Sequence, residues 1–352
     1  MKYTRFKSLK SQKRTLRKRN PFYKSFSNFN SNTRSNNERK ETNNTVQITA
    51  PRNFSIINNH QEMLAFFTLM NNALKANNNI YLNMNDIENI TEDAILYLIS
   101  RLIYVQKRYP EHRVSGNFPK NKECEKILFA CKFNKYVVTN RTYDIDNNEI
   151  LYLVDGFETD GKYVQKVLRF VSSKVNLEIV NRADAYSVIT EVLINSKHHA
   201  YKTFNPYEKW WMIALPDKNK KIVHITLLDN GQGIPRTIKK NFADKVSAIK
   251  EKFSFSINGN ISRIDSELIV SALEGEFRTS TGDKDRGTGM PTIFDASNNP
   301  QIDNLIIISN FAYVKIGKSK TISKKITLND MFEGTLISWD FIDDPYQLER
   351  IN

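Results

Sequence analysis

Three polar stretches in the second half of the chain combine residue types suited to holding phosphates, a divalent cation and a nucleobase. In order, they are Glu191-x-x-x-Asn195-x-x-x-His199, Asp229-Asn-Gly231-Gln-Gly233 and Arg286-Gly287-Thr288-Gly289-Met290. Each stretch alone is weak evidence. Their order, and their expected positions on a helix, at a strand end and before a helix, favour one shared pocket for ATP.

The first stretch lies in a helix expected over residues 183–200, where residues four apart share a face. The amide oxygen of Asn195 is a hard ligand of the kind that Mg²⁺ prefers. The carboxylate of Glu191, one turn earlier, can orient or deprotonate a water or hydroxyl that attacks a γ-phosphate. An amphipathic helix with a polar outer face explains the same spacing, and a structural role is assigned to His199.

The second stretch follows an apolar strand expected over residues 222–228. A carboxylate at Asp229 can accept a hydrogen bond from the exocyclic amine of adenine, which guanine cannot reproduce. Gly231 and Gly233 carry no side chains, so a base can lie against the backbone there. A strand that ends in a glycine turn is the simpler interpretation of this stretch.

The third stretch places glycines before a helix, where free amides and the helix dipole favour an anion. Arg286 adds positive charge that can face a triphosphate. The stretch lacks the Lys-Ser/Thr ending of a P-loop and the acidic residue that follows a dinucleotide-binding loop. It therefore indicates phosphate binding only in combination with the other two.

Together the three stretches resemble the N, G1 and G2 boxes of the GHKL superfamily of gyrase, heat-shock chaperone, histidine kinase and mismatch-repair ATPases. The resemblance covers residues 150–342 and implies a Bergerat-type α/β sandwich, with helices on one face of a mixed sheet. It implies that Asn195 holds Mg²⁺, that Glu191 is the catalytic carboxylate and that Asp229 selects adenine.

The same resemblance assigns further residues to the nucleotide. Gly231 and Gly233 would shape the adenine pocket, and the run Arg286, Gly287, Thr288 and Gly289 would meet the phosphates. Gly334-Thr335 resembles the late Gly-Thr of the family, in which the Thr335 hydroxyl would support the adenine contact. Residues 236–285 would form the ATP lid, a cover whose closure depends on nucleotide.

Strands and helices alternate over residues 46–140, which predicts a small α/β domain. The run Tyr81–Ala94 resembles, more weakly, a STAS domain, the fold of anti-sigma-factor antagonists. Asp93 stands where that family carries a phosphorylatable Ser or Thr, so the domain is degenerate in this respect. Glu92 and Asp93 are interpreted as a cap of the helix that they begin, in preference to mimics of a permanently charged state. The expected strands are 46–48, 54–56, 80–84 and 113–114, and the expected helices are 61–76, 94–105 and 124–133.

Residues 141–352 are predicted to form the ATP-binding domain. Its polar segment from Pro235 to about Phe277 is expected to be partly helical, and a turn is expected over residues 217–220. The other expected elements are β structure within 144–160, helices at 164–175 and 183–200, and strands at 210–215, 222–228, 305–309, 313–316 and 335–341.

Composition is ordinary for a folded protein of about two domains. The 352 residues are 40% hydrophobic and 26% charged. No run approaches the ~18 apolar residues of a membrane span, and no signal-peptide core is present. A cytoplasmic protein with no membrane partner is therefore expected, with Cys124 and Cys131 reduced.

Positive charge is concentrated at the N-terminus. Residues 1–45 hold thirteen Lys/Arg and two Glu, a net of +11 out of the total of +14. So basic and polar a segment is predicted to be disordered. Its lysines, arginines and interleaved aromatic residues suit phosphates and stacked bases of DNA or RNA, although a solvated tail without a ligand explains them equally well.

These observations favour an ATP-binding regulator whose lid gates contact with a protein partner or a second copy. Slow hydrolysis or anti-sigma-type serine kinase activity is compatible with Glu191. A histidine kinase is disfavoured, because His60 and His112 are expected in polar turns. Two alternatives stay open: a nucleic-acid-associated ATPase clamp held by residues 1–45, and a scaffold with a vestigial pocket.

Overall fold

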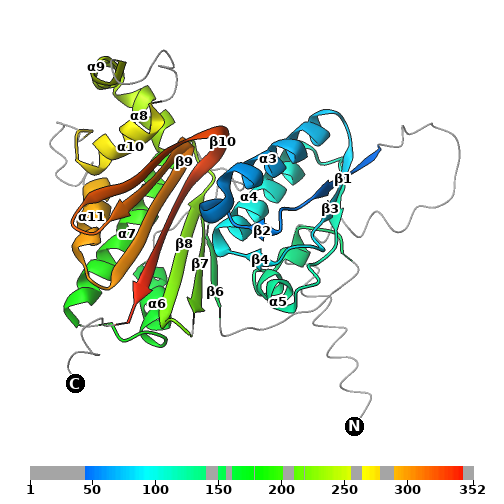
Figure 1. Ribbon diagram of the computed structural model, residues 1–352, viewed down its shortest axis with the longest axis horizontal. Coiled ribbons are helices and arrows are strands. Elements are labelled where there is room, and N and C mark those ends of the chain that lie inside the picture. The colour runs from blue at the N-terminus through cyan, green and yellow to red at the C-terminus, as the bar shows by residue number, and fades with distance from the viewer. Residues whose placement is uncertain are drawn as a thin grey trace, which may run out of the picture. The chain divides into compact units, whose positions relative to one another are not determined.

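A computed structural model describes residues 44–139, 150–155, 161–177, 179–200, 210–217, 219–254, 264–277 and 289–343. Residues Asn44–Asn352 form one compact unit. The fold is mixed α/β, with both parallel and antiparallel strand pairs (Figure 1). None of the helices in the described ranges has the length and apolar character that crossing a membrane requires. The basic residues 1–43 and the expected domain boundary near residue 140 lie outside the described residues.

The first part of this unit is built from short parallel strands and three helices. The strand order is β1-β3-β5, and β2 pairs separately with β4. This confirms the expected alternation, with three corrections. The segment expected as a strand over 54–56 ends at Phe54, and a helix begins at Ile56. The short strand Asn89–Ile90 was not expected, and the helix expected over 124–133 ends at Ala130. The elements are β1 (Thr45–Thr49), β2 (Asn53–Phe54), α3 (Ile56–Lys75), β3 (Asn79–Asn83), β4 (Asn89–Ile90), α4 (Glu92–Arg108), β5 (Val114–Gly116), α5 (Lys122–Ala130) and η1 (Phe133–Lys135).

Two side chains cap the start of α3. The hydroxyl of Ser55 accepts from the amide of Asn58 at 3.2 Å. The Asp93 carboxylate, which comes from α4, accepts from the amides of Ile56 at 2.6 Å and Ile57 at 3.0 Å. These amides have no partners inside the helix and attract negative charge. Asp93 therefore caps α3, not the helix that it begins, and it fixes the start of α3 together with Ser55.

The second part contains a five-stranded sheet of order β6-β7-β8-β10-β9. All neighbouring pairs among these described strands are antiparallel, which corrects the expectation of a mixed sheet. Short turns join β7 to β8 and β9 to β10, and such connections produce antiparallel pairs. The elements are β6 (Leu151–Asp155), α6 (Gly161–Ser172), α7 (Ile179–Ala200), β7 (Trp210–Asp217), β8 (Ile222–Asp229), α8 (Ile234–Asn241), α9 (Ala243–Ser254), α10 (Asp265–Leu273), α11 (Gly289–Asp295), η2 (Ala296–Asn298), β9 (Ile302–Gly317) and β10 (Thr321–Ile342).

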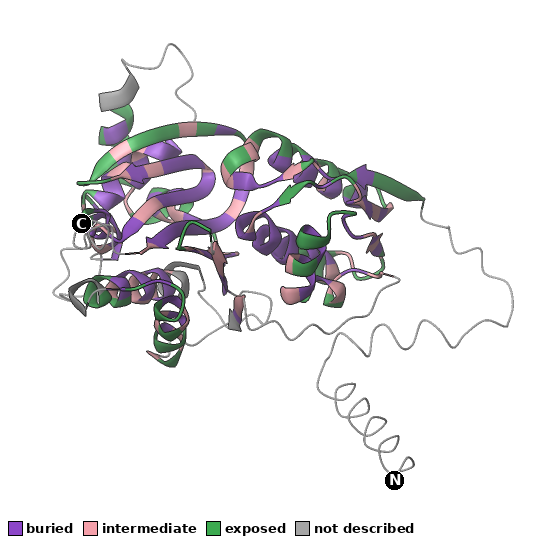
Figure 2. Ribbon diagram, turned by 60° about the horizontal axis from the view of Figure 1, so that its bottom comes forward, coloured by how far each residue is buried: buried purple, intermediate pink, exposed green. Residues whose placement is uncertain are grey.

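The last two strands are much longer than the sequence pattern indicates. The strands expected at 305–309 and 313–316 are one strand, β9, and β10 begins well before the expected residue 335. The first half of β10 is largely exposed, whereas its second half is buried (Figure 2). An exposed, lysine-rich half-strand lacks the apolar alternation by which strands are recognised.

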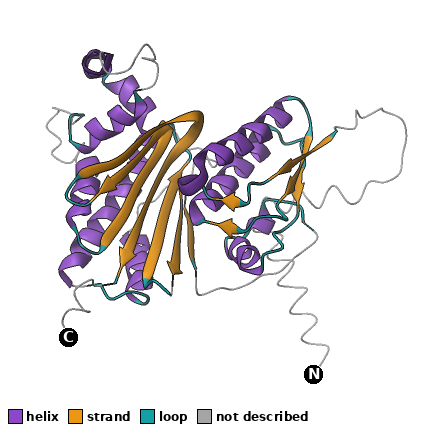
Figure 3. Ribbon diagram, viewed as in Figure 1, coloured by secondary structure: helices purple, strands orange, loops and turns teal. Residues whose placement is uncertain are grey.

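Both faces of the sheet are covered, as Figures 1 and 3 show. On β8, Val223, Ile225 and Leu227 pack with buried residues of α6, α7 and α11. The next side chain, Leu228, points to the opposite face and belongs to the core shared with α3 and α4. Side chains alternate between the faces of a strand, so β8 contributes to two cores. The first part of the chain thus covers the face opposite α7.

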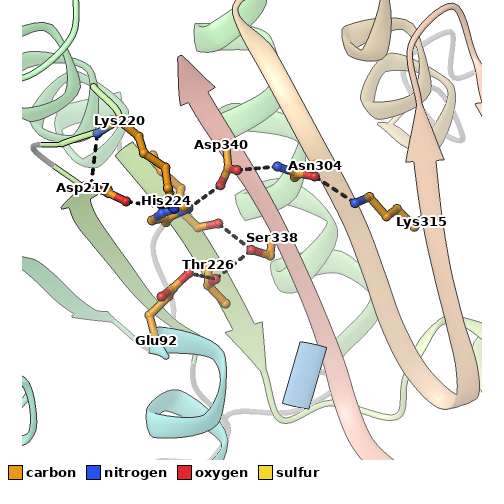
Figure 4. Close-up of polar contacts among 10 residues, drawn as sticks. Glu92, Asp217, Lys220, His224, Thr226, Asn304, Lys315, Ser338 and Asp340 are labelled. Carbon is orange, nitrogen blue, oxygen red and sulfur yellow. Dashed lines mark hydrogen bonds and ion pairs between the residues drawn. The ribbon is translucent and has the colours of Figure 1, made fainter. Parts of the chain in front are cut away.

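Polar residues cross the α4 side of the sheet (Figure 4). Two cross-strand pairs lie there, Thr226 beside Ser338 and His224 beside Asp340. The Thr226 hydroxyl lies 2.9 Å from the Ser338 hydroxyl and 3.3 Å from a carboxylate oxygen of Glu92 on α4. A nitrogen of His224 lies 2.6 Å from a carboxylate oxygen of Asp340. These contacts join α4 to the sheet by polar as well as apolar groups.

Burial changes the acid–base behaviour of this cluster. Desolvation, followed by the charge of Asp93, raises the pKa of Glu92 to about 7. The hydrogen bond with Asp340 raises the pKa of His224 above its usual value. Both shifts make the folded protein bind protons more tightly than the unfolded chain, so stability is lost as pH rises.

The Glu92→Gln variant is expected to be more stable than the wild type above pH 7 and similar at pH 5. The pKa of Glu92 is raised from 4.5 to about 7, so its protonated form stabilises the fold below 4.5 and this contribution is lost as pH rises to 7. Glutamine stays neutral, which removes a pH-dependent loss on the order of 3 kcal/mol. Thermal unfolding of both proteins from pH 5 to 8 measures the difference.

The matched control is Glu88→Gln, because the Glu88 side chain is 63% exposed, and exposed substitutions change stability by about 0.5 kcal/mol or less. Parallel stability curves for the wild type and Glu92→Gln would contradict the prediction.

Candidate functional site

The first and third predicted stretches meet in the structure. Glu191 and Asn195 lie on α7, and buried Gly289 is the first residue of α11. A Cβ atom at Gly289 would lie only 2.8 Å from a carboxylate oxygen of Glu191 and 2.8 Å from both terminal atoms of the Asn195 amide. Position 289 therefore accommodates a larger residue only if these two side chains move, because real Cβ contacts are longer than this.

The chemistry at this junction suits a hydrated cation held together with an anionic ligand. The Nδ2 atom of Asn195 is buried and has no hydrogen-bond partner among the described residues. Burial raises the pKa of Glu191. No group of three His, Cys, Asp or Glu residues in the described ranges could hold a metal. Glu191 and Asn195 offer a carboxylate and an amide oxygen, which are ligand types that Mg²⁺ accepts, and Mg²⁺ usually takes its other ligands from water and phosphates.

Other residues of these two stretches are described only in part. His199 lies in the last turn of α7, but its side chain is not described. Arg286, Gly287 and Thr288 lie outside the described residues. Met290 follows Gly289, is half-buried, and packs against both the sheet core and a smaller core formed by α8, α9 and α10.

The second predicted stretch meets the late Gly-Thr at the end of β8. Asp229 pairs with Thr335 of β10, and both side chains are buried at 7% and 6% exposure. A carboxylate oxygen of Asp229 accepts from the amide of Gly231 at 2.9 Å. Because Asp229 alternates with Leu228, it lies on the α7 face of the sheet. Helix α7, which carries Glu191 and Asn195, covers this same face.

Asp229 is a buried acid, and among the described residues no neighbouring cation stabilises its charge. Burial raises its pKa to about 7, while hydrogen bonds from the amides of Gly231 and Thr335 act in the opposite direction. A buried carboxyl with a perturbed pKa costs stability at neutral pH, and such groups are concentrated at functional sites. The structure therefore marks Asp229 as a candidate binding group independently of the sequence motif.

Two glycines here have conformations that other residues rarely adopt. Gly233 has φ +86°, and a Cβ atom there would lie 2.5 Å from the side-chain nitrogen of Asn310. Gly334 has φ +94°, and its Cβ would lie 2.0 Å from the carbonyl oxygen of Asp229. Both positions require glycine. Gly233 makes room for a protein side chain, which is a different reason from the predicted contact with a base.

Sequence reasoning missed two polar residues next to Thr335 and Gly233, namely Ser309 and Asn310. The Ser309 hydroxyl lies 3.2 Å from that of Thr335 and donates to the carbonyl of Gly334 at 2.9 Å. In the sequence, these residues form a polar pair that interrupts the apolar run of β9, and this interruption could have identified them. The placement of His60 also needs correction: it lies within α3, not in a turn.

The chain matches no protein-family model and no curated protein. The site is therefore defined by its own geometry. One end consists of Glu191, Asn195 and Gly289 on helices α7 and α11. The other end consists of Asp229 and Thr335, on the sheet face that α7 covers.

Proposed function

We propose that the protein binds Mg²⁺-ATP in a GHKL-type pocket on the α7 face of the sheet. The observation that carries the proposal is the contact of Gly289 with Glu191 and Asn195. The amide of Asn195, the carboxylate of Glu191 and the start of helix α11 at Gly289 come together there, although α7 and α11 are distant in the sequence. In the proposed complex, Asn195 completes the coordination of Mg²⁺, and Gly289 follows the loop that meets the phosphates.

The adenine base is assigned to the other end, where Asp229 would accept from its exocyclic amine. The proposal is supported by the burial of Asp229, which raises its pKa, and by Thr335 beside it. A buried acceptor that costs stability in the free protein is explained if a ligand donor satisfies it. The second part of the fold is then a GHKL domain, and the first is a degenerate STAS-like domain.

The biological role that we favour is that of a regulator. The STAS-like part covers the sheet face opposite α7, and Glu92 and Asp93 are buried there. This arrangement separates them from Glu191 and gives no support to phosphoryl transfer within one chain. We propose that nucleotide, through the segment 236–285, gates contact with a protein partner or a second copy.

The Glu191→Ala variant is expected to bind Mg²⁺-ATP within about threefold of the wild type, while any ATP turnover falls by about 10²-fold or more. Asn195→Ala should instead lose the part of the affinity that depends on Mg²⁺. Titration calorimetry with and without EDTA, together with phosphate release, separates the two effects.

Thr190→Ala is the matched control on α7, since its hydroxyl has no hydrogen-bond partner among the described residues. It should behave as the wild type. A wild-type protein that does not bind Mg²⁺-ATP would disprove the proposed function.

The alternative function is an ATPase clamp on nucleic acid. It is favoured by the net charge of +11 on residues 1–45. Binding of DNA or RNA should then weaken steeply with salt, and this dependence should vanish when residues 1–45 are removed. A shallow salt dependence that truncation does not alter would exclude the clamp.

A further inference from the structure

The helix α8 is capped by residues of another element. It begins after Gly233, which has no side chain to act as a cap. Instead, the amide of Ile234 donates to the Ser309 hydroxyl at 3.0 Å, and the amide of Arg236 donates to the side-chain oxygen of Asn310 at 3.1 Å. Unpaired amides at a helix start need such acceptors. Strand β9 therefore determines where α8 begins.

Asn310 bridges both sides of Gly233. Its side-chain nitrogen donates to the carbonyl of Gln232 at 3.1 Å, while its oxygen accepts from Arg236. Its backbone has φ +51°, a conformation that Asn tolerates better than most residues. The chain around Gly233 is thus clamped by one carboxamide.

The next residue of β9 contacts a second helix. The amide of Phe311 donates to the carboxylate of Asp265 at 3.1 Å, and Asp265 is the first residue of α10. Asp265 is buried and forms an ion pair with Lys239 of α8. The pairing of β9 with β10 changes register at this point, between Thr327 and Phe332. Such irregularities redirect backbone groups, and they are frequent beside active sites.

The same short segment is linked to both ends of the candidate site, the base end at Asp229 and Thr335 and the phosphate end at Glu191, Asn195 and Gly289. Ser309 contacts Thr335 and Gly334 at the base end. The core of α8, α9 and α10 packs against Met290, which follows Gly289 at the phosphate end. We call residues Ser309–Phe311 the β9 anchor. It links α8 and α10 directly to the base end and, through their core, to the phosphate end.

We propose that Ser309 and Asn310 are positioning residues, which hold α8 and α10 so that a nucleotide engages the base end and the phosphate end together. This inference rests on the proposed function. Neither residue needs to touch the nucleotide. Loss of the Asn310 carboxamide should leave the contacts of Ser309 with Thr335 and Gly334 intact while weakening the contribution of the phosphates to affinity.

The test is Asn310→Gly, which permits the same backbone conformation and removes both side-chain hydrogen bonds. Affinity for Mg²⁺-ATP should fall about tenfold, corresponding to about 1.4 kcal/mol, while affinity for adenosine stays within about twofold. Hydrogen exchange at the first amides of α8 should accelerate. Asn310→Asp retains the acceptor for the amide of Arg236 but loses the donor to the carbonyl of Gln232, so its ATP affinity should lie between that of Asn310→Gly and that of the wild type.

The matched control is Asn304→Gly, because Asn304 also lies on β9 with positive φ, at 49°, but contacts Asp340 and Lys315 instead of α8. It should leave the ratio of ATP to adenosine affinity unchanged. Equal losses for ATP and adenosine in Asn310→Gly, or no loss for either, would overturn the positioning role. A wild type that binds neither ATP nor adenosine would instead overturn the proposed function. The hydrogen-exchange rates of the α8 amides test the β9 anchor separately, because they are measured without nucleotide.

Discussion

The Asp229→Asn variant is expected to bind Mg²⁺-ATP roughly 30- to 150-fold more weakly than the wild type. In the proposed complex the Asp229 carboxylate accepts from the adenine amine inside a buried site. Asparagine can present a donor there, which leaves polar groups unpaired at a cost of about 2–3 kcal/mol. Calorimetric titration of both proteins with ATP and with GTP measures the loss and the base preference.

The same substitution should not unfold the protein. The pKa of Asp229 is raised from 3.8 to about 7, so the stability that its protonated form provides is lost as pH rises through this range. Above pH 7 the neutral asparagine should make the free protein at least as stable as the wild type. Loss of binding together with retained or increased stability would identify Asp229 as a binding residue.

Asp340→Asn provides the contrast. The Asp340 carboxylate is also buried, but it lies on the α4 face and accepts from His224 and Asn304. This variant should lose stability and keep its ATP affinity. If Asp229→Asn and the wild type bind ATP equally well, the assignment of the adenine contact is wrong.

The Gly334→Ala variant is expected to have the largest effect on stability, a loss of about 3–4 kcal/mol. Gly334 has φ +94°, and an added Cβ would lie 2.0 Å from the carbonyl oxygen of Asp229 and 3.0 Å from the backbone of Asn230. These atoms are backbone, so relief requires β8 and β10 to separate. The midpoint of thermal unfolding should fall by roughly 10 °C.

Gly317→Ala is the control within the same hairpin. An added Cβ at position 317 would meet chiefly the side-chain oxygen of Thr321, at 2.7 Å. That side chain can rotate away, so the loss should be much smaller. Equal unfolding midpoints for Gly334→Ala and the wild type would show that β10 can shift at little cost.

Local patterns predicted much of the secondary structure. Helices α4 and α7 and strands β3, β7 and β8 lie close to where apolar periodicity places them. The turn between β7 and β8 also agrees, because Asp217 accepts from the amides of Asn219 and Lys220, as short-range turn chemistry predicts. These elements depend on contacts between residues near in sequence.

The predicted element bounds were wrong where contacts between residues distant in the sequence determine the structure. The start of α3 depends on Asp93 from α4, and the first half of β10 is a strand because β9 pairs with it. No local pattern contains either partner. The same holds for Ser309 and Asn310, whose role becomes visible only when α8 lies beside β9.

The amino-acid sequence by itself determined which residue types were available for a nucleotide site, and in which order, because motif spacing is a local property. The tertiary structure decided that Gly289 contacts Glu191 and Asn195, and that Asp229 is buried beside Thr335. It also decided that Glu92 and Asp93 face other elements and not solvent. Burial and proximity depend on how whole elements pack, and this packing sets the pKa values and contacts from which a site acquires its chemistry.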